Sequence, residues 1–186
     1  MVGVRIRRAG VDDAEIIARL HVAAWRESYA AIVPREALAA MDVSDRAARW
    51  RDIFHAQEDD GASAVFLAIG EDDEPKGFAA CGRQRVERVE AAGFAGEFTA
   101  IYLLGRAHQR RGLGRALMGA MAKNLIAKGL SSASVWVFRD NSVARRFYEA
   151  LGGEETGIDG EWSVLGVALP DMSYGWRDIS NLVAHQ

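Results

Sequence analysis

Gln109-Arg110-Arg111-Gly112-Leu113-Gly114 is the most informative stretch of this 186-residue sequence. It follows a strand-like run at residues 97–104 and precedes a helix-like run that begins near Leu113. A glycine-bearing turn between a strand and a helix points several backbone N–H groups the same way, at the positive end of the helix dipole. Arginines beside such a turn add charge-assisted hydrogen bonds. The stretch therefore predicts a binding site for a phosphate or diphosphate group.

Two familiar glycine loops do not match this stretch. A Walker-type loop needs Lys followed by Ser or Thr after its last glycine, whereas this chain has Arg115-Ala116. A Rossmann fingerprint needs a third glycine where this chain has Leu117, and it normally lies in the first βα unit. The sequence therefore disfavours ATP and NAD as ligands.

Composition limits the class of protein. The chain has 49% hydrophobic residues, enough for one core, and a net charge of −3 with a pI near 5.8, which gives no reason to expect nucleic-acid binding. Its one cysteine, Cys81, cannot form an internal disulfide and is expected to fill the core. Residues 1–8 lack the apolar core of a secretory leader, and no apolar run approaches the ~20 residues that span a bilayer. We expect a cytoplasmic protein that binds no membrane.

Apolar periodicity and turn residues predict alternating strands and helices. Asp12 and Glu15 form a candidate capping box at the start of the first helix. Residues 89–96 are predicted as a connection, and strands 97–104 and 132–138 as parallel neighbours joined by a crossover helix. The predicted strands are 2–7, 64–70, 76–86, 97–104, 132–138, 155–169 and 172–178; the predicted helices are 12–30, 35–57 with a break near 42–44, 113–128 and 142–151.

The glycine stretch resembles the Q/R-x-x-G-x-G/A loop of the GCN5-related N-acetyltransferases, the GNAT superfamily. Glu97-Phe98-Thr99-Ala100-Ile101-Tyr102-Leu103 upstream and residues 141–152 downstream match further motifs in the order that the family shows. The resemblance covers most of the chain. It implies one GNAT domain over residues 1–186, an α/β (α+β) fold with a mixed, mostly antiparallel sheet of about seven strands, about four helices and splayed central parallel strands.

The resemblance also implies an activity, the transfer of an acetyl group from acetyl-CoA to a primary amine of a small molecule or peptide, by direct attack in a ternary complex. No metal is implied, and a homodimer is left open. The implied cofactor-binding residues are Ile101, Tyr102 and Leu103, whose backbone would bind pantetheine; Gln109, Arg110, Arg111, Gly112, Leu113, Gly114 and Arg115 around the diphosphate; and Asn141, Ala144 and Tyr148.

By the same resemblance, Tyr148 is the general acid that protonates the departing thiolate. A phenol of reference pKa ~10 stays protonated at neutral pH and can donate to a thiolate whose conjugate acid lies near ~8.5. Tyr148 follows Asn141 by seven residues, which is about two turns or ~10 Å along a helix. The alternative is that Asn141 only caps the helix and Tyr148 is only a core aromatic.

Glu97 is the candidate general base, because relatives often carry a glutamate at this place. Several residues of strand, at ~3.3 Å each, separate it from the backbone that would bind the acetyl carbonyl, so we expect it to act through water. The alternatives are that Glu97 binds the acceptor or has a structural role.

Two segments mix aromatic and acidic residues and are candidates for the acceptor site, residues 25–29 and residues 159–162. Trp25 and Tyr29 could hold a cationic amine by cation–π contacts, although their i, i+4 spacing is equally typical of core packing. The identity of the acceptor stays open.

One feature departs from the family pattern. Five residues, 104–108, precede the loop, where relatives commonly have four, and a β-bulge in the preceding strand could absorb the difference. His108 is more simply a turn residue than a phosphate ligand. Two rival functions remain, a non-catalytic acyl-CoA-binding domain and an acyltransferase that uses another acyl-CoA.

Overall fold

The computed structural model describes residues 5–105 and 112–183, built around one seven-stranded sheet of order β1-β2-β3-β4-β5-β7-β6. Adjacent strands are antiparallel except β4 and β5, which are parallel. This confirms the predicted mixed α/β fold and the predicted parallel neighbours. The strands are β1 (Arg5–Arg8), β2 (Ala64–Ile69), β3 (Pro75–Arg83), β4 (Gly96–Leu103), β5 (Ala133–Phe138), β6 (Glu154–Val164) and β7 (Val167–Trp176).

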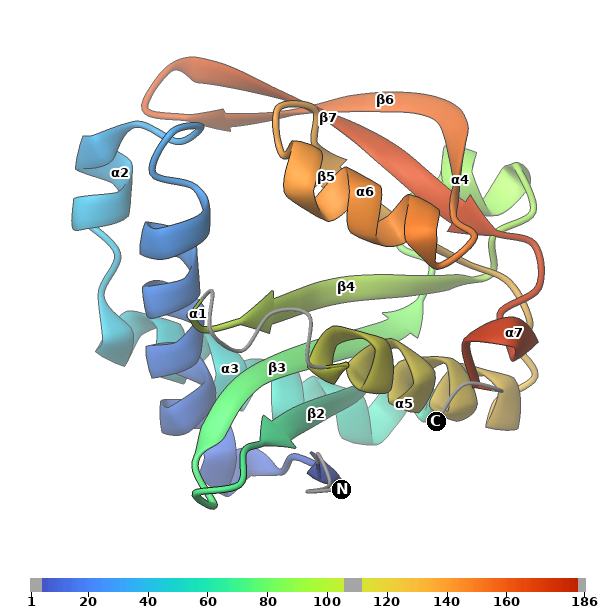
Figure 1. Ribbon diagram of the computed structural model, residues 1–186, viewed down its shortest axis with the longest axis horizontal. Coiled ribbons are helices and arrows are strands. Elements are labelled where there is room, and N and C mark those ends of the chain that lie inside the picture. Colours follow the sequence, from blue (N-terminus) through green and yellow to red (C-terminus); the bar gives the residue numbers. More distant parts are fainter. Residues whose placement is uncertain (1–4, 106–111, 184–186) are drawn as a thin grey trace.

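Helices cover both faces of the sheet. In Figure 1, α5 and α6 lie in front of the strands and α3 lies behind them. The helix α5 connects the parallel strands β4 and β5, as the crossover rule requires. The helices are α1 (Ala14–Ser28), α2 (Arg35–Ala39), α3 (Val43–Asp60), α4 (Glu87–Ala91), α5 (Leu113–Ala127), α6 (Ser142–Ala150) and α7 (Ser180–Val183), with a 3-10 turn at Val11–Asp13.

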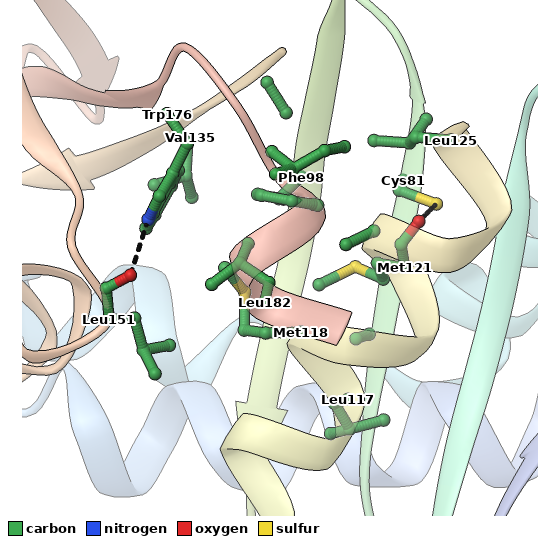
Figure 2. Close-up of a cluster of buried hydrophobic side chains, with 14 of the residues drawn as sticks. Cys81, Phe98, Leu117, Met118, Met121, Leu125, Val135, Leu151, Trp176 and Leu182 are labelled. Carbon is green, nitrogen blue, oxygen red and sulfur yellow. Dashed lines mark hydrogen bonds between the residues drawn. The ribbon is translucent and has the colours of Figure 1, made fainter. Parts of the chain in front are cut away.

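The core has a layer on each side of the sheet. On the α5 side, four side chains of that helix pack against Phe98 and Val135, and the Trp176 indole N–H donates to the Leu151 carbonyl over 2.9 Å (Figure 2). On the other side, α1 and α3 pack on β2 and β3 through Ile17 and Trp50, among others. The four α5 side chains, all fully buried, are Leu117, Met118, Met121 and Leu125.

Two predicted helix starts have different outcomes. The break before the third helix is confirmed, because the Asp42 carboxylate caps α3 by accepting from the N–H groups of Ser44 and Asp45. The capping box of Asp12 and Glu15 is wrong. Asp13 takes that role instead, since its carboxylate accepts from the Gly10 N–H at 2.9 Å and forms an ion pair with Arg7.

The predicted division between the last two strands is also wrong. Pro170 and Asp171 resemble a turn in the sequence, yet both lie inside β7 and pair with β6. The turn is Leu165-Gly166, where both residues have positive φ, 50° and 75°. Two central residues with positive φ form the type I′ turn, which suits the twist of a hairpin.

Short helices account for the remaining differences. The predicted connection at residues 89–96 begins inside α4, and α7 was not predicted, so the described residues contain seven α-helices rather than about four. Elements of four or five residues carry too little periodicity to be recognised. Within the described residues, no helix is both long enough and apolar enough to cross a membrane.

Candidate active site

The two parallel strands separate soon after they pair. Only Gly96–Ala133 and Glu97–Ser134 are paired between β4 and β5, although β4 continues to Leu103 and β5 to Phe138. Beyond those pairs, β4 stays bonded to β3 and β5 to β7. We call the space between residues 98–103 and 135–138 the splay. Backbone groups that face the splay can accept an extended chain as an added strand.

A β-bulge lies where the splay begins. The pairing of β3 with β4 passes from Ala80–Ala100 to Cys81–Phe98, so Thr99 has no partner in the register. The bulge re-aims the strand. As a result Phe98 and Ile101 pack on the α5 side, whereas Ala100 and Tyr102 pack on the α1 side. A β-bulge was predicted in this strand to account for the extra residue before the glycine loop. The start of that loop lies outside the described residues.

The start of α5 lies beside the splay. Gly112 is the N-cap residue in the left-handed region, with φ 83° and ψ −8°, and no side-chain cap is formed there by the described residues. First-turn N–H groups without such a cap are available to an anion. Gly114 allows close packing, because a Cβ there would come within 3.1 Å of the Phe147 ring. Leu113 is buried. Gln109, Arg110 and Arg111 lie outside the described residues.

The helix α6 brings Asn141, Ala144 and Tyr148 to the other side of the splay. The Asn141 Oδ1 accepts from the Ala144 N–H at 3.1 Å, which makes Asn141 the N-cap of α6. Its amide also lies near the Tyr29 hydroxyl and opposes the rise that burial causes in the Tyr29 pKa. Asn141 therefore links the start of α6 to the end of α1.

Tyr148 is buried, with 4% of its surface exposed. Its ring lies edge-on to Trp176 at 6.0 Å and near Tyr174 at 6.1 Å. Burial raises the pKa of the Tyr148 phenol, and the nearby Tyr102 phenol adds to this rise. The phenol is therefore protonated over the physiological pH range and can serve as a proton donor.

On the face opposite α5, aromatic side chains of α1, its C-cap residue, β5 and β6 meet. Trp25 contacts Tyr29 at 5.0 Å and Trp162 at 5.4 Å, and Phe138 contacts Tyr29 at 5.1 Å and Trp162 at 5.8 Å. We call these four residues the aromatic group. Tyr102 of β4 lies at the edge of this group, with its ring centre 6.3 Å from that of Tyr29. The structure thus brings together Trp25, Tyr29 and the separate segment that contains Trp162.

His21, which the sequence did not single out, packs against Tyr102. Its ring stacks on Tyr102 at 5.2 Å, and its Nδ1 accepts from the Trp50 indole N–H at 3.3 Å. Burial, with a smaller contribution from the charge of Arg46, lowers the pKa of His21 to about 3. His21 is therefore neutral at physiological pH and does not act as an acid–base group there.

Glu97 lies at the paired end of β4 and is 2% exposed. Its carboxylate accepts from the Arg85 guanidinium through two bonds, of 2.7 and 3.0 Å, and from the Arg85 backbone N–H at 3.3 Å. The hydrogen bond with Glu97 raises the pKa of Arg85. These contacts favour the structural role for Glu97 over that of a general base.

We predict that Glu97→Gln will lower the free energy of unfolding by about 1–3 kcal/mol, because its buried amide N–H₂ would face the Arg85 guanidinium and lack an acceptor. Urea denaturation measures this. If Glu97 is structural, the pH profile of kcat/KM keeps its shape in Glu97→Gln, and Arg85→Met lowers the free energy of unfolding in the same way. Activity that is lost at neutral pH and recovered at high pH would instead identify Glu97 as a base.

These features define a class of protein. A sheet whose parallel central strands splay beside a glycine-started helix is the architecture of the acetyl-CoA-dependent N-acetyltransferases. The chain belongs to the acetyltransferase (GNAT) family, whose sequence model matches residues 22–153. It is 35% identical over 179 residues, 96% of each chain, to the uncharacterized N-acetyltransferase YuaI of Bacillus subtilis strain 168. Members of this family transfer acetyl groups, so the chain is an acyltransferase.

A second curated protein is similar in sequence over part of the chain, and two solved structures are similar in fold. A mycothiol acetyltransferase of Clavibacter sepedonicus is 39% identical over 93 residues, which are 50% of this chain and 26% of that protein. PaiA N-acetyltransferase of Thermoplasma acidophilum, solved with coenzyme A, has a TM-score of 0.69 at 18% identity and covers 94% of this chain and 99% of its own. YncA of Salmonella typhimurium, solved with acetyl-CoA, has a TM-score of 0.68 at 19% identity, with coverage of 96% and 95%.

Proposed function

We propose that this protein transfers the acetyl group of acetyl-CoA to a primary amine in a ternary complex. The splay of β4 and β5, with the Tyr148 side chain buried beside it, is the observation that carries the proposal. Two proteins of similar fold were solved with coenzyme A or acetyl-CoA, which supports the choice of donor.

We infer that the donor binds in an extended form along β4. Backbone groups of Ile101, Tyr102 and Leu103 would hold the pantetheine as an added strand, since β5 leaves them unpaired. The N-terminus of α5 at Gly112 would receive the diphosphate together with Arg110, Arg111 and Arg115. Backbone N–H groups near the Thr99 bulge would stabilise the developing oxyanion.

Tyr148 is the proposed general acid. Its neutral, buried phenol supplies a proton to the sulfur as the C–S bond breaks and the new C–N bond forms. Release of a thiol rather than a thiolate makes the reverse attack unfavourable.

Water is the proposed acceptor of the amine's proton. Burial raises the pKa of Tyr29 and Tyr102, so both phenols stay protonated and cannot accept a proton, and it lowers the pKa of His21 to about 3, so this imidazole is a weak base. Glu97 is paired with Arg85. The neutral fraction of the amine should therefore set the rise of kcat/KM with pH.

The experiment is a panel of amines incubated with acetyl-CoA and, separately, with longer acyl-CoAs, with free thiol and acylated amine both measured. The proposal expects equal amounts of the two products with acetyl-CoA. Binding of the acyl-CoA without any acylated amine would contradict it and favour a binding domain. A clear preference for a longer acyl-CoA would favour the other acyltransferase.

We also propose a cytoplasmic location, which suits a sequence whose one cysteine can form no internal disulfide. A small-molecule or peptide amine is the proposed partner. The homodimer stays a prediction, which light scattering can test.

A further inference from the structure

Three buried side-chain polar atoms lack a hydrogen-bond partner among the residues that the structure describes. They are Trp25 Nε1, Asp171 Oδ1 and Ser173 Oγ. The Trp25 N–H approaches the Tyr102 hydroxyl but does not reach hydrogen-bond geometry. A buried group left unpaired costs about 1–3 kcal/mol, so such atoms are uncommon and need an explanation.

Asp171 lies next to the aromatic group. On β7 it is directly opposite Phe138 of β5 on one side and Gly160 of β6 on the other. Directly opposed residues of antiparallel strands share a face, so the carboxylate is on the same face of the sheet as the Phe138 ring. Because β5 borders the splay, Asp171 is one strand spacing, ~4.8 Å, beyond that border.

A glycine makes room for this carboxylate. A Cβ at position 160 would lie 2.4 Å from Asp171 Oδ1 and 2.9 Å from the Trp136 ring. Any larger residue at this position would displace one of the two side chains. The Asp171 Oδ1 atom therefore packs over Gly160 and beside Trp136, while Asp171 as a whole is half-buried, with Phe138 next to it on the same face.

The charged neighbours of Asp171 have other partners. Arg88 lies 5.7 Å from the centre of the Trp136 ring and attracts Asp171 electrostatically, but it donates its hydrogen bond to the Asp159 carbonyl. The Asp159 carboxylate is paired with Arg139 at 2.6 Å. Burial, opposed by the charge of Arg88, raises the pKa of Asp171. A further cation would compensate this carboxylate better than the protein does.

We propose that Asp171 binds a second, unreacting cationic group of the acceptor, so that the protein prefers alkyl diamines to monoamines. This inference rests on the proposed acetyl transfer. The attacking nitrogen must be neutral and must reach the splay, whereas the other nitrogen stays protonated one strand away at Asp171. Phe138 and Trp162 cover the alkyl chain between them and add cation–π attraction.

The kinetic test compares 1,4-diaminobutane, 1-aminobutane and 4-aminobutanoate as acceptors. With the unaltered protein we expect kcat/KM for the diamine to exceed that of the monoamine by roughly tenfold, the value of one hydrogen bond to a charged group, and the amino acid to be the poorest. Asp171→Asn should raise KM for the diamine roughly tenfold, leave kcat within about twofold, and leave the monoamine unchanged. Asp159→Asn is the matched control and should keep the preference.

A binding measurement separates this inference from the proposed function. The diamine is titrated calorimetrically into the protein, with and without saturating coenzyme A, and into Asp171→Asn after circular dichroism has shown that the variant is folded. Tighter binding of diamine than of monoamine, lost in Asp171→Asn, supports the inference even if no amine is acetylated. Equal binding of the two amines, or an unchanged preference in Asp171→Asn, overturns it.

Discussion

Tyr148→Phe is expected to lower kcat by roughly 10²–10⁴-fold while acetyl-CoA affinity stays nearly unchanged, because a positioned proton donor contributes about that much to rate. The substitution removes the hydroxyl and keeps the ring that packs against Trp176. Steady-state kinetics and a calorimetric titration of acetyl-CoA measure the two quantities.

Tyr174→Phe is the matched control. It also removes one tyrosine hydroxyl from the same buried cluster, but that hydroxyl donates to Glu149 at 2.7 Å on α6. We expect lower stability, by about 1 kcal/mol, and little change in kcat. Full activity of Tyr148→Phe, where chemistry is shown to limit turnover, would contradict the assignment of the acid.

The expected pH dependence of kcat follows from the raised pKa of Tyr148. Since burial raises its pKa above the usual phenol value, the acid form persists at every pH below that value. The kcat of the unaltered protein should therefore show no alkaline decline between about pH 7 and 9.5, below the ~10 of an ordinary phenol. An alkaline decline in that range that disappears in Tyr148→Phe would show that the phenol titrates there.

Gly112→Val is expected to weaken coenzyme A binding by roughly 10–100-fold, or about 1.4–2.8 kcal/mol. Gly112 has φ 83°, which L-residues seldom adopt, and among the residues that the structure describes, its chain neighbours aside, no atom lies within 4 Å of the position of a Cβ. The valine side chain would therefore occupy open space at the helix N-terminus, where we propose that the diphosphate binds.

Gly129→Val is the control for strain. Gly129 follows the other end of α5 and has φ 76°, and apart from its chain neighbours no atom of the described part of the chain lies within 4 Å of its Cβ position. Both variants should lose similar stability, whereas only Gly112→Val should lose affinity. Arg110→Ala should lose part of the affinity. Unchanged affinity in a folded Gly112→Val protein would place the diphosphate elsewhere.

Long periodic segments made most of the fold predictable from the sequence. The α5 helix and the strands β4 and β5 carry continuous apolar patterns, and the need for a crossover makes the two strands parallel neighbours. The turn Leu165-Gly166 could not be recognised, because leucine seldom takes a positive φ and Pro170-Asp171 offers a stronger turn signal.

Contacts between residues far apart in the sequence were harder to predict. The sequence places Glu97 at a family position but does not show that Arg85, twelve residues earlier on the neighbouring chain segment, neutralises it. Nothing local marks His21 as a buried support for Tyr102, or Asp171 as a carboxylate beside Phe138, because the first depends on how α1 packs on β4 and the second on strand register. Register is set by the folded sheet rather than by any single segment.

A crystal structure of this protein with acetyl-CoA tests the central claim most directly. We predict that the pantetheine lies between residues 98–103 of β4 and 135–138 of β5, with the thioester sulfur within hydrogen-bonding distance of the Tyr148 hydroxyl. A pantetheine bound outside the splay, or a sulfur out of reach of Tyr148, would contradict the account.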